Sequence, residues 1–388
     1  IEAITAHQQV GGRAFIVCPA YLRENWADEY RKWCINVPDI KVLKTAKQIK
    51  ECRDYEVAII SYSGLQHAAH LYARAKVVAV DECQAIKNSD SQRTTIFTNL
   101  IKSKPPSYLF LLSGTPIKNR VTEFYSALKL TSYNPFGVGG AFFGFSSYYS
   151  FAGHFAHSTR INVNGFEVTK YFGMKKETLP ELKRLLVGKY IRVRAEDVLK
   201  DLPEITEKEI FVDVKDGKLL QQWKDLESSE LHNSTQKSQS AAIKAPKTAE
   251  YVNDLIATGE CAVVFTDHLD SQALIARKIK GRVGIINGGV TPDKRHFLVK
   301  EFQEGRLDCL VLTIGAGGTG FTLTRSRHLI FNDQSWVPGD NKQAWKRIHR
   351  IGQKRGVIIH YIIGGHIDKL ISRSIREKEK VLKDVLED

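Results

Sequence analysis

Two adjacent carboxylates, Asp81 and Glu82, directly follow the apolar run VVAV at residues 77–80. Neighbouring carboxylates at the end of a buried strand are costly unless they meet a cation or water. A nucleotide-hydrolysing site uses such a pair, because one carboxylate holds Mg²⁺ through its water shell and the other orients the attacking water. A solvated turn would also accommodate the dipeptide, so its position after an apolar run is what favours the catalytic interpretation.

A second polar segment, Ser113-Gly114-Thr115-Pro116, follows the apolar run YLFLL at 108–112. The Ser and Thr hydroxyls can relay a hydrogen bond between a nucleotide site and a neighbouring surface, and glycine lets the backbone approach closely. An ordinary turn has the same composition.

Two arginines, Arg347 and Arg350, lie in AWKRIHRIGQ at 344–353, which is expected to open as a helix. Residues three apart share one helical face. Two guanidiniums aimed at one point would stabilise charge on a transferring phosphoryl group, as arginine fingers do. A basic helix lying on DNA phosphates is the alternative, and spacing does not separate the two.

A glycine-rich loop, GAGGTG at 315–320, follows the apolar run CLVLT. Exposed backbone N–H groups in such a loop can hold phosphate oxygens. A tight turn would explain the glycines equally well.

Short apolar, β-branched runs must position these groups. Continuous runs of about five residues indicate strands that are buried on both faces, as in a parallel sheet. Helical patterns lie between them at 23–33, 269–279 and 293–303, which predicts a doubly wound α/β fold with ligands beyond the carboxyl ends of the strands. The runs are AFIVCP (14–19), EVAIIS (56–61), KVVAVDE (76–82), YLFLLSGTP (108–116), CAVVFTD (261–267), CLVLTIGAGG (309–318), RHLIFND (327–333) and GVIIHYII (356–363).

The length of 388 residues suits two domains. The polar segment SELHNSTQKSQS (229–240) is interpreted as a loop or hinge. We predict a first lobe over 1–190, a linker with hinge helices over 191–245, a second lobe over 246–370 and a bracing helix over 371–388.

An aromatic insertion is expected at 134–175, within the first lobe. It contains FFGFSSYYSFAGHF, whose rings could stack on exposed bases. An inserted helix that buries an aromatic face is favoured, because basic residues are nearly absent before Arg160. INVNGFEV (161–168) predicts a hairpin that turns at Asn164-Gly165.

The charge balance favours a polyanionic partner. Lys and Arg number 57 against 43 Asp and Glu, which gives +14, and cations on phosphates release condensed counterions. On charge alone, nucleic acid is favoured, and acidic membranes are the main alternative. No apolar run approaches the ~20 residues of a membrane span. The six cysteines lack a CxxC pair and read as buried free thiols of a reducing, intracellular compartment, whether cytoplasm, nucleoid or nucleus.

Taken in order, the motifs resemble those of the Swi/Snf family of superfamily-two ATPases, and most closely its annealing-helicase (HepA-related) branch. The resemblance covers nearly the whole chain, and RIHRIGQ combined with SGTPIKN is its most specific part. The matching segments are FIVCPAYLRENWADEYRKW (15–33), VVAVDECQAIKN (77–88), LFLLSGTPIKN (109–119), KYIRVRAEDVLKDLPEITEKEI (189–210), AVVFTDH (262–268), the run from LVLTIGAGGTG to RIHRIGQ (310–353) and VIIHYII (357–363).

The resemblance implies two RecA-like lobes with ATP and Mg²⁺ bound between them and double-stranded DNA lying across both. It implies a monomer and leaves open whether the DNA is plain, forked or branched. It gives catalytic roles to Asp81, Glu82, Arg347 and Arg350, with Asp81 holding Mg²⁺ through water. It gives cofactor binding to Gln343, Gly318 and Gly320, and coupling to Gln84, Ser113 and Thr115. It gives DNA contacts to Pro19, Ser61, Tyr62, Phe265, Gly288, Arg295, Thr313, Gly315 and Trp336.

Three departures from the family pattern bear on these roles. The acidic motif reads DECQ where the family has DEAH or DEGH, so we expect altered but retained coupling. The region after SGTPIKN is longer and more aromatic. The family places a phosphate-binding GxGKT loop just before IEAITA, and no GxxxxGK[ST] occurs in the 388 residues. We therefore expect the chain by itself to bind ATP poorly.

Three functions stay open at this point. The first is an ATP-driven translocase on duplex DNA. The second is a degenerate clamp that binds DNA without hydrolysis. The third is a strand-separating helicase, for which the aromatic insertion would be the wedge.

Overall fold

The computed structural model describes residues 1–88, 90–133, 144–145, 147–163, 165–193, 195–212, 221–222, 233–317 and 321–386. The chain forms two compact units. Unit 1 comprises Ile1–Arg192 and Lys380–Asp388, and unit 2 comprises Val193–Glu379.

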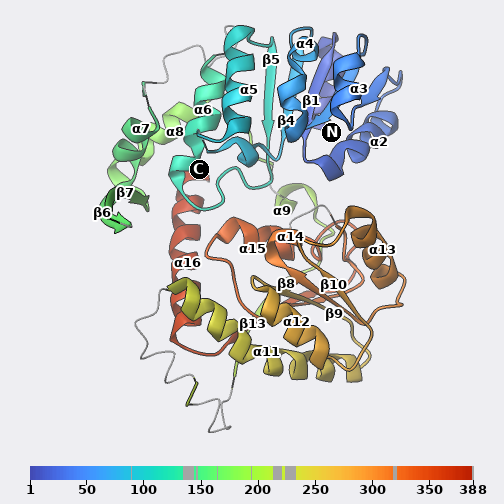
Figure 1. Cartoon of the computed structure of the whole chain (residues 1–388), viewed down its shortest axis with the longest axis vertical. Coiled ribbons are helices and arrows are strands. Elements are labelled where there is room, and N and C mark those ends of the chain that lie inside the picture. Colours follow the sequence, from blue (N-terminus) through green and yellow to red (C-terminus); the bar gives the residue numbers. More distant parts are fainter. Residues whose placement is uncertain are drawn as a thin grey trace. The chain divides into compact units, whose positions relative to one another are not determined.

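Unit 1 is built on a five-stranded parallel sheet (Figure 1). The strand order is β2-β3-β1-β4-β5. Register places Asp81, the last residue of β4, opposite Leu112, the last residue of β5. The carboxyl ends of β4 and β5 are therefore neighbours. The strands are β1 (Ala14–Cys18), β2 (Ile40–Val42), β3 (Val57–Ser61), β4 (Val77–Asp81) and β5 (Tyr108–Leu112).

Helices cover both faces of this sheet, which explains why its central strands are apolar throughout. In β1, Phe15 and Val17 pack into one core, whereas Ile16 and Cys18 pack into the other. The first core takes residues from α3 (Ala46–Glu51), α4 (Ala69–Tyr72) and α5 (Gln92–Ser103). The second takes residues from α1 (Glu2–Val10) and α2 (Arg23–Trp33).

The aromatic insertion buries an aromatic face, as favoured from the sequence. Phe151 and Phe155 are fully buried in a separate core that also holds Val385. The predicted hairpin is present as an antiparallel pair, while Asn164 and residues 134–143 lie outside the described residues. The elements are α6 (Phe124–Ser132), α7 (Tyr148–Phe155), β6 (His157–Val163), β7 (Phe166–Phe172) and α8 (Leu179–Leu186).

Unit 2 is built on a six-stranded parallel sheet with the order β10-β11-β9-β12-β13-β8. Two cores again lie on its two faces. The strands are β8 (Ile205–Phe211), β9 (Ala262–Thr266), β10 (Val283–Ile286), β11 (Cys309–Thr313), β12 (His328–Phe331) and β13 (Val357–Ile363). The helices are α9 (Ala195–Val198), α11 (Asn233–Ala257), α12 (Leu269–Lys278), α13 (Pro292–Gln303), α14 (Ile314–Gly317), α15 (Pro338–Trp345) and α16 (His366–Leu386).

The prediction of two doubly wound parallel α/β lobes is confirmed, but two elements occupy what was expected to be linker. Strand β8 lies at the edge of the sheet and has the sequence ITEKEIF. An edge strand can be largely exposed, so it does not show the continuous apolar run that marks the central strands. Helix α11 includes 233–240, which was expected to be loop, and its buried positions further along are small alanines with little apolar contrast. Residues 229–232 lie outside the described ranges.

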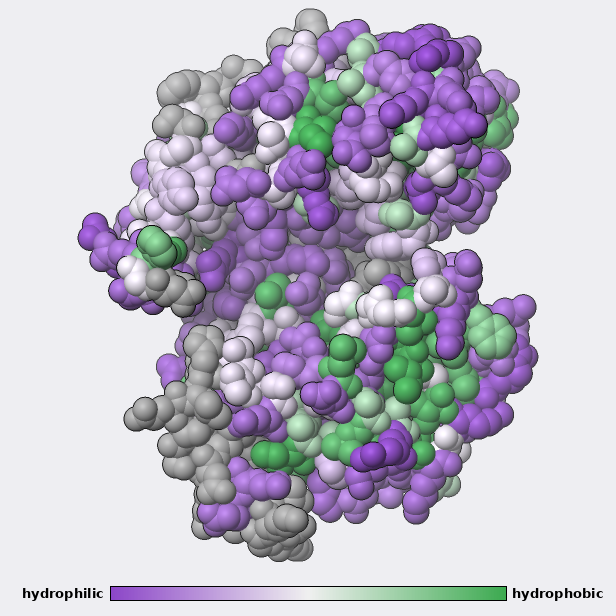
Figure 2. All heavy atoms as spheres, in the orientation of Figure 1, coloured by the Kyte–Doolittle hydropathy of each residue, from purple (hydrophilic) through white to green (hydrophobic). Residues whose placement is uncertain are grey.

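The visible surface of unit 1 is largely polar (Figure 2). Hydrophilic side chains cover most of the visible face of unit 1 (Figure 2). Among the described residues, none of the helices has the length and apolarity that crossing a bilayer requires. All six cysteines are free thiols, four of them buried.

Candidate active site

The acidic pair lies where β4 ends. Asp81 is its last residue, and its Oδ1 accepts a hydrogen bond from the backbone N–H of Glu82 at 2.8 Å. Its Oδ2 accepts a hydrogen bond from Nε1 of Trp26, on α2, at 2.9 Å. Burial raises the pKa of the Asp81 carboxyl, and the bond from Trp26 opposes that shift.

Glu82 has a strained backbone. Its φ of 52° makes it the sole non-glycine residue with positive φ in the described ranges. Such a conformation costs about 1–3 kcal/mol and needs surrounding contacts to persist. The hydroxyl of Tyr62 supplies them by donating to the carbonyls of Asp81 (2.6 Å) and Glu82 (3.1 Å). Tyr62 thus fixes the turn that aims the Glu82 carboxylate.

A hydrogen-bond relay connects Glu82 to the segment after β5. The Gln84 amide donates to the Glu82 carboxylate. Gln84 Oε1 in turn accepts from the Ser113 hydroxyl at 2.6 Å, and Ser113 Oγ accepts from the Thr115 backbone N–H at 3.0 Å. The three residues predicted to couple the motifs are therefore brought together in the order Gln84, Ser113, Thr115.

The loop that carries Ser113 is anchored by Glu123. One carboxylate oxygen pairs with the Lys87 ammonium at 2.6 Å. The other accepts from the backbone N–H groups of Lys118 (2.7 Å) and Asn119 (3.2 Å). This carboxylate ties the segment after β4 to the segment after β5 a second time.

The carboxylates fit a magnesium ion. Mg²⁺ binds through one or two carboxylates while keeping waters and substrate phosphates as its other ligands. Asp81 offers hard oxygen donors, and a nearby cation would offset the burial that raises its pKa. No group of three or more His, Cys, Asp or Glu placed for metal binding occurs in the part of the chain that the structure describes, so any ion would depend on phosphate oxygens as well.

The arginines of unit 2 do not share a helical face, contrary to the expectation. Helix α15 ends at Trp345, and Arg347 and Arg350 lie in the turn that follows. The carbonyl of Arg347 accepts from the N–H of Leu323, so it is not available to continue the helix. Arg350 donates to the carbonyl of Phe321 at 3.3 Å, and burial lowers the pKa of its guanidinium.

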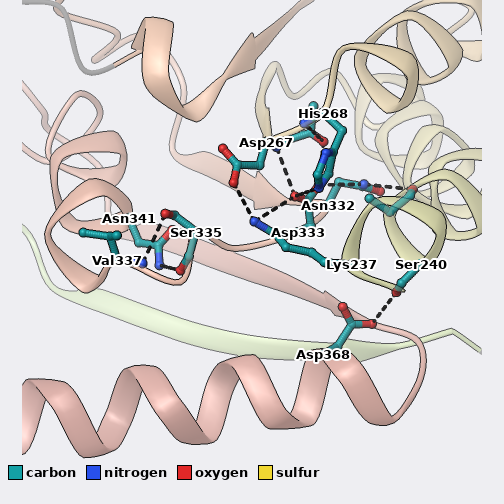
Figure 3. A network of polar contacts seen from close by, with 12 residues as sticks. Lys237, Ser240, Asp267, His268, Asn332, Asp333, Ser335, Val337, Asn341 and Asp368 are labelled. Carbon is teal, nitrogen blue, oxygen red and sulfur yellow. Dashed lines mark hydrogen bonds and ion pairs between the residues drawn. The ribbon is translucent and has the colours of Figure 1, made fainter. Parts of the chain in front are cut away.

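A buried polar network lies at the carboxyl ends of β9 and β12 (Figure 3). Lys237, at the start of α11, lies between Asp267 and Asp333, at 2.5 and 3.9 Å from their carboxylates. Asp333 also accepts from the Thr266 hydroxyl and from the N–H of Asp267 (3.0 Å). Further along α11, fully buried Lys244 pairs with Asp368 at 2.6 Å. The network fixes α11 to the edge of the sheet where ligands bind in this architecture.

The expected cofactor residues are only partly described. Gln343 lies half-buried on α15. Gly318 and Gly320 lie outside the described residues.

The residues expected to contact DNA have diverse surroundings. Pro19, Thr313 and Gly315 lie at or just after strand ends and are not buried, and Gly288 is exposed in the turn after β10.

Other residues of this set make contacts within the fold. Arg295 donates to three carbonyls of the 287–290 turn and so positions it. Trp336 packs against Ile367, Ile371 and Ile375. Ser61 is buried.

Phe265 requires a correction. Its side chain is fully buried and packs beside Phe331, with ring centroids 5.9 Å apart. That leaves no side-chain surface for DNA, because Phe265 is the fourth residue of the five-residue central strand β9 and its ring packs into the core.

Sequence reasoning missed Trp26, Glu123, Lys237, Asp267 and Asp333. The two aspartates each follow an apolar run, the same signal that revealed Asp81. Trp26 carried no such signal, because an indole within a helix usually serves packing.

Comparison with known proteins shows two family models that match this chain. The SNF2-related domain model matches residues 1–257, and the helicase conserved C-terminal domain model matches residues 244–352. The DNA annealing helicase and endonuclease ZRANB3 of Bos taurus is 26% identical over 409 residues, which cover 96% of this chain and 36% of that protein. A SWI/SNF-related matrix-associated actin-dependent regulator of chromatin, subfamily A-like protein 1, of Xenopus laevis is 28% identical over 402 residues, covering 98% and 40%.

A solved structure, the Sulfolobus solfataricus SWI2/SNF2 ATPase core in complex with dsDNA, has a TM-score of 0.41 and 20% identity, covering 99% of this chain and 84% of that chain. The chain spans well under half the length of the two curated relatives.

Proposed function

The chain belongs to the family with an SNF2-related domain, and on this premise we propose that it is the motor core of an ATP-driven translocase on double-stranded DNA. The observation that carries the proposal is the relay from Glu82 through Gln84 to Ser113 at the carboxyl ends of β4 and β5. Through this relay, the acidic pair Asp81 and Glu82 is hydrogen-bonded to the SGTP segment that follows β5.

In the proposed mechanism four residues divide the chemistry among them. In the proposed site, Glu82 orients the attacking water and accepts its proton, since its backbone and carboxylate are both held in place. Asp81 would hold Mg²⁺ through water. When bound, the ion neutralises charge on the phosphate oxygens. Arg347 and Arg350, as arginine fingers, would stabilise charge on the phosphoryl group that is transferred.

The DNA partner is supported by charge and by relatives. The net charge of +14 favours a polyanion. One relative is a DNA annealing helicase and endonuclease. We propose that phosphate contacts supply most of the affinity, so that binding is largely independent of sequence and weakens with salt. We further propose that the protein acts as a monomer in an intracellular setting, to which the free thiols are suited.

Substitution of Glu82 by Gln tests this function. The variant keeps the size and hydrogen bonding of the side chain but cannot accept the water's proton. We expect ATP turnover by the full-length protein to fall about 10²–10⁴-fold, while ATP binding, measured by equilibrium titration, is unchanged. Turnover at the wild-type rate would remove Glu82 from this role. A wild-type protein that binds DNA without any turnover would instead support the non-hydrolysing clamp.

A further inference from the structure

A cavity of about 600 Å³ opens on unit 1. It lies between the segments that follow β4 and β5 and the start of α7. Its volume falls in the range of about 300–1,000 Å³ that is typical of ligand sites. Every residue that lines it belongs to unit 1. The side chains that matter here are Lys87, Asn119, Arg120, Lys129, Tyr148 and Tyr149.

Two cations in the wall, Arg120 and Lys129, form no ion pair with a described residue, although the carboxylates of Asp90 and Glu123 also line the cavity. Lys87 is paired with Glu123, but Arg120 makes no side-chain hydrogen bond or ion pair with any described residue. Lys129 donates to the hydroxyl of Tyr125 at 3.1 Å and lies 5.3 Å from the centre of that ring. It meets no carboxylate within the described ranges. A phosphate group in the cavity would pair with both cations.

Two tyrosine rings line the cavity: Tyr148 is held by neighbouring side chains, and Tyr149 is exposed. Tyr148 is held edge-on against Tyr125 (5.8 Å) and Tyr171 (6.1 Å). Its hydroxyl donates to Thr122 Oγ1 at 3.3 Å. Tyr149, by contrast, is 67% exposed. An exposed ring beside cations is the arrangement on which nucleic-acid bases stack.

One polar atom of a wall residue has no hydrogen-bond partner among the described residues. Asn119 Oδ1 is buried and has no hydrogen-bond donor among the described residues. Buried polar groups are almost always paired, so an orphaned acceptor next to a cavity indicates a polar site that is completed by something else.

We propose that this cavity takes an unpaired nucleotide of a DNA strand, with its phosphate on Arg120 and Lys129 and its base on Tyr149. The proposal rests on the proposed DNA-binding function and specifies the form of its substrate. Within a duplex the base faces are covered by their neighbours, so Tyr149 can stack only on a base that has left the helix. Binding the backbone of a duplex would need only the cations and not an exposed ring. The cavity therefore favours tailed or branched DNA over a blunt duplex.

The test compares equilibrium binding of the 388-residue chain to a fluorescent blunt duplex and to the same duplex with a single-stranded tail. We expect Tyr149→Ala to weaken binding to the tailed DNA about 5-fold or more, the lower end of the effect of losing one stacked base. Binding to the blunt duplex should stay unchanged. Arg120→Gln should also weaken binding to the tailed DNA. The dependence of that affinity on salt concentration should fall by the equivalent of about one phosphate contact.

Two control variants separate stacking from folding. Tyr149→Phe keeps the ring and should bind like the wild type. Tyr108→Ala removes another exposed tyrosine near a lysine, at the amino end of β5, and should leave tail preference intact. Thermal unfolding of each variant confirms that unit 1 is folded.

The outcomes distinguish this proposal from the proposed function. A wild-type chain that binds no DNA contradicts both. A chain that binds blunt and tailed duplexes equally overturns only the nucleotide site. The site is likewise overturned if Tyr149→Ala and Arg120→Gln weaken both DNAs to the same extent, which would identify the cavity as a duplex contact.

Discussion

At the scale of single residues, the site depends on groups that hold the two carboxylates rather than on the carboxylates alone. Tyr62 was expected to lie on the DNA track, yet its hydroxyl fixes the carbonyls of Asp81 and Glu82. Trp26 was not among the expected site residues, yet its indole N–H donates to the Asp81 carboxylate. Both side chains position the chemistry from within unit 1.

Tyr62→Phe tests the positioning of Glu82. The change removes one hydroxyl and the two hydrogen bonds it donates, so unfolding in urea should become easier by about 1–2 kcal/mol. ATP turnover by the full-length protein should fall while ATP affinity stays constant, because the strained turn loses its support.

Tyr72→Phe is the matched control. Its hydroxyl donates to the carbonyl of Lys104 at 2.9 Å, away from the acidic pair. It should cost similar stability and leave turnover unchanged. Equal losses of turnover in both variants would show that Tyr62 acts only through stability.

Trp26→Phe tests whether the indole orients Asp81. The ring remains, but Oδ2 of the carboxylate loses its donor. We expect a higher Mg²⁺ concentration to be needed for half-maximal turnover. Trp33→Phe removes a similar bond, to Glu29 at 2.7 Å on the exposed face of the same helix, and should not change the Mg²⁺ requirement. An unchanged requirement in Trp26→Phe would contradict the positioning role.

At the scale of elements, strands β12 and β13 carry a buried histidine pair. His328 Nδ1 and His360 Nε2 lie 3.0 Å apart, and the Tyr251 hydroxyl lies 3.0 Å from His360 Nδ1. Burial lowers the pKa of His360 from 6.5 to about 3 and also lowers that of His328, while Glu260 opposes the shift at His328. Other charges that face the pair are those of Lys208, Arg327 and Arg355.

Unit 2 should therefore lose stability in acid. Between pH 6.5 and about 3 the unfolded chain binds a proton at His360 and the folded chain does not, so the free energy of unfolding falls as the pH falls. The lowered pKa of His328 acts in the same direction. Urea unfolding of unit 2 at several pH values measures this. In His360→Leu part of the acid sensitivity should disappear, and a variant that keeps the full pH dependence would contradict this account.

The central strands and their helices could be predicted from sequence because both faces of each sheet are covered, which makes the strands apolar throughout. Edge strand β8 and the first turns of α11 could not be predicted. An edge strand needs no continuous apolar run, and residues 233–240 of α11 are polar, with the buried alanines lying further along. Within the site, residues that follow apolar strands could be found. Trp26 and Glu123 could not, because their contacts are made across the fold by residues distant in sequence.

At the scale of the whole molecule, each of the two units carries one part of the expected chemistry. Unit 1 holds the acidic pair and its relay, and unit 2 holds Arg347, Arg350 and the network around Asp333. The positive net charge is the property of the whole chain that bears on its partner. A motor of this kind should hydrolyse ATP quickly only when it grips duplex DNA.

The most direct measurement is the rate of ATP hydrolysis by the full-length protein with and without duplex DNA, at low and at high salt. The account predicts that duplex DNA raises the rate, and that the stimulation weakens as salt displaces the phosphate contacts. Hydrolysis that proceeds equally fast without DNA, at every salt concentration, would contradict the assignment of the chain as the core of a DNA translocase.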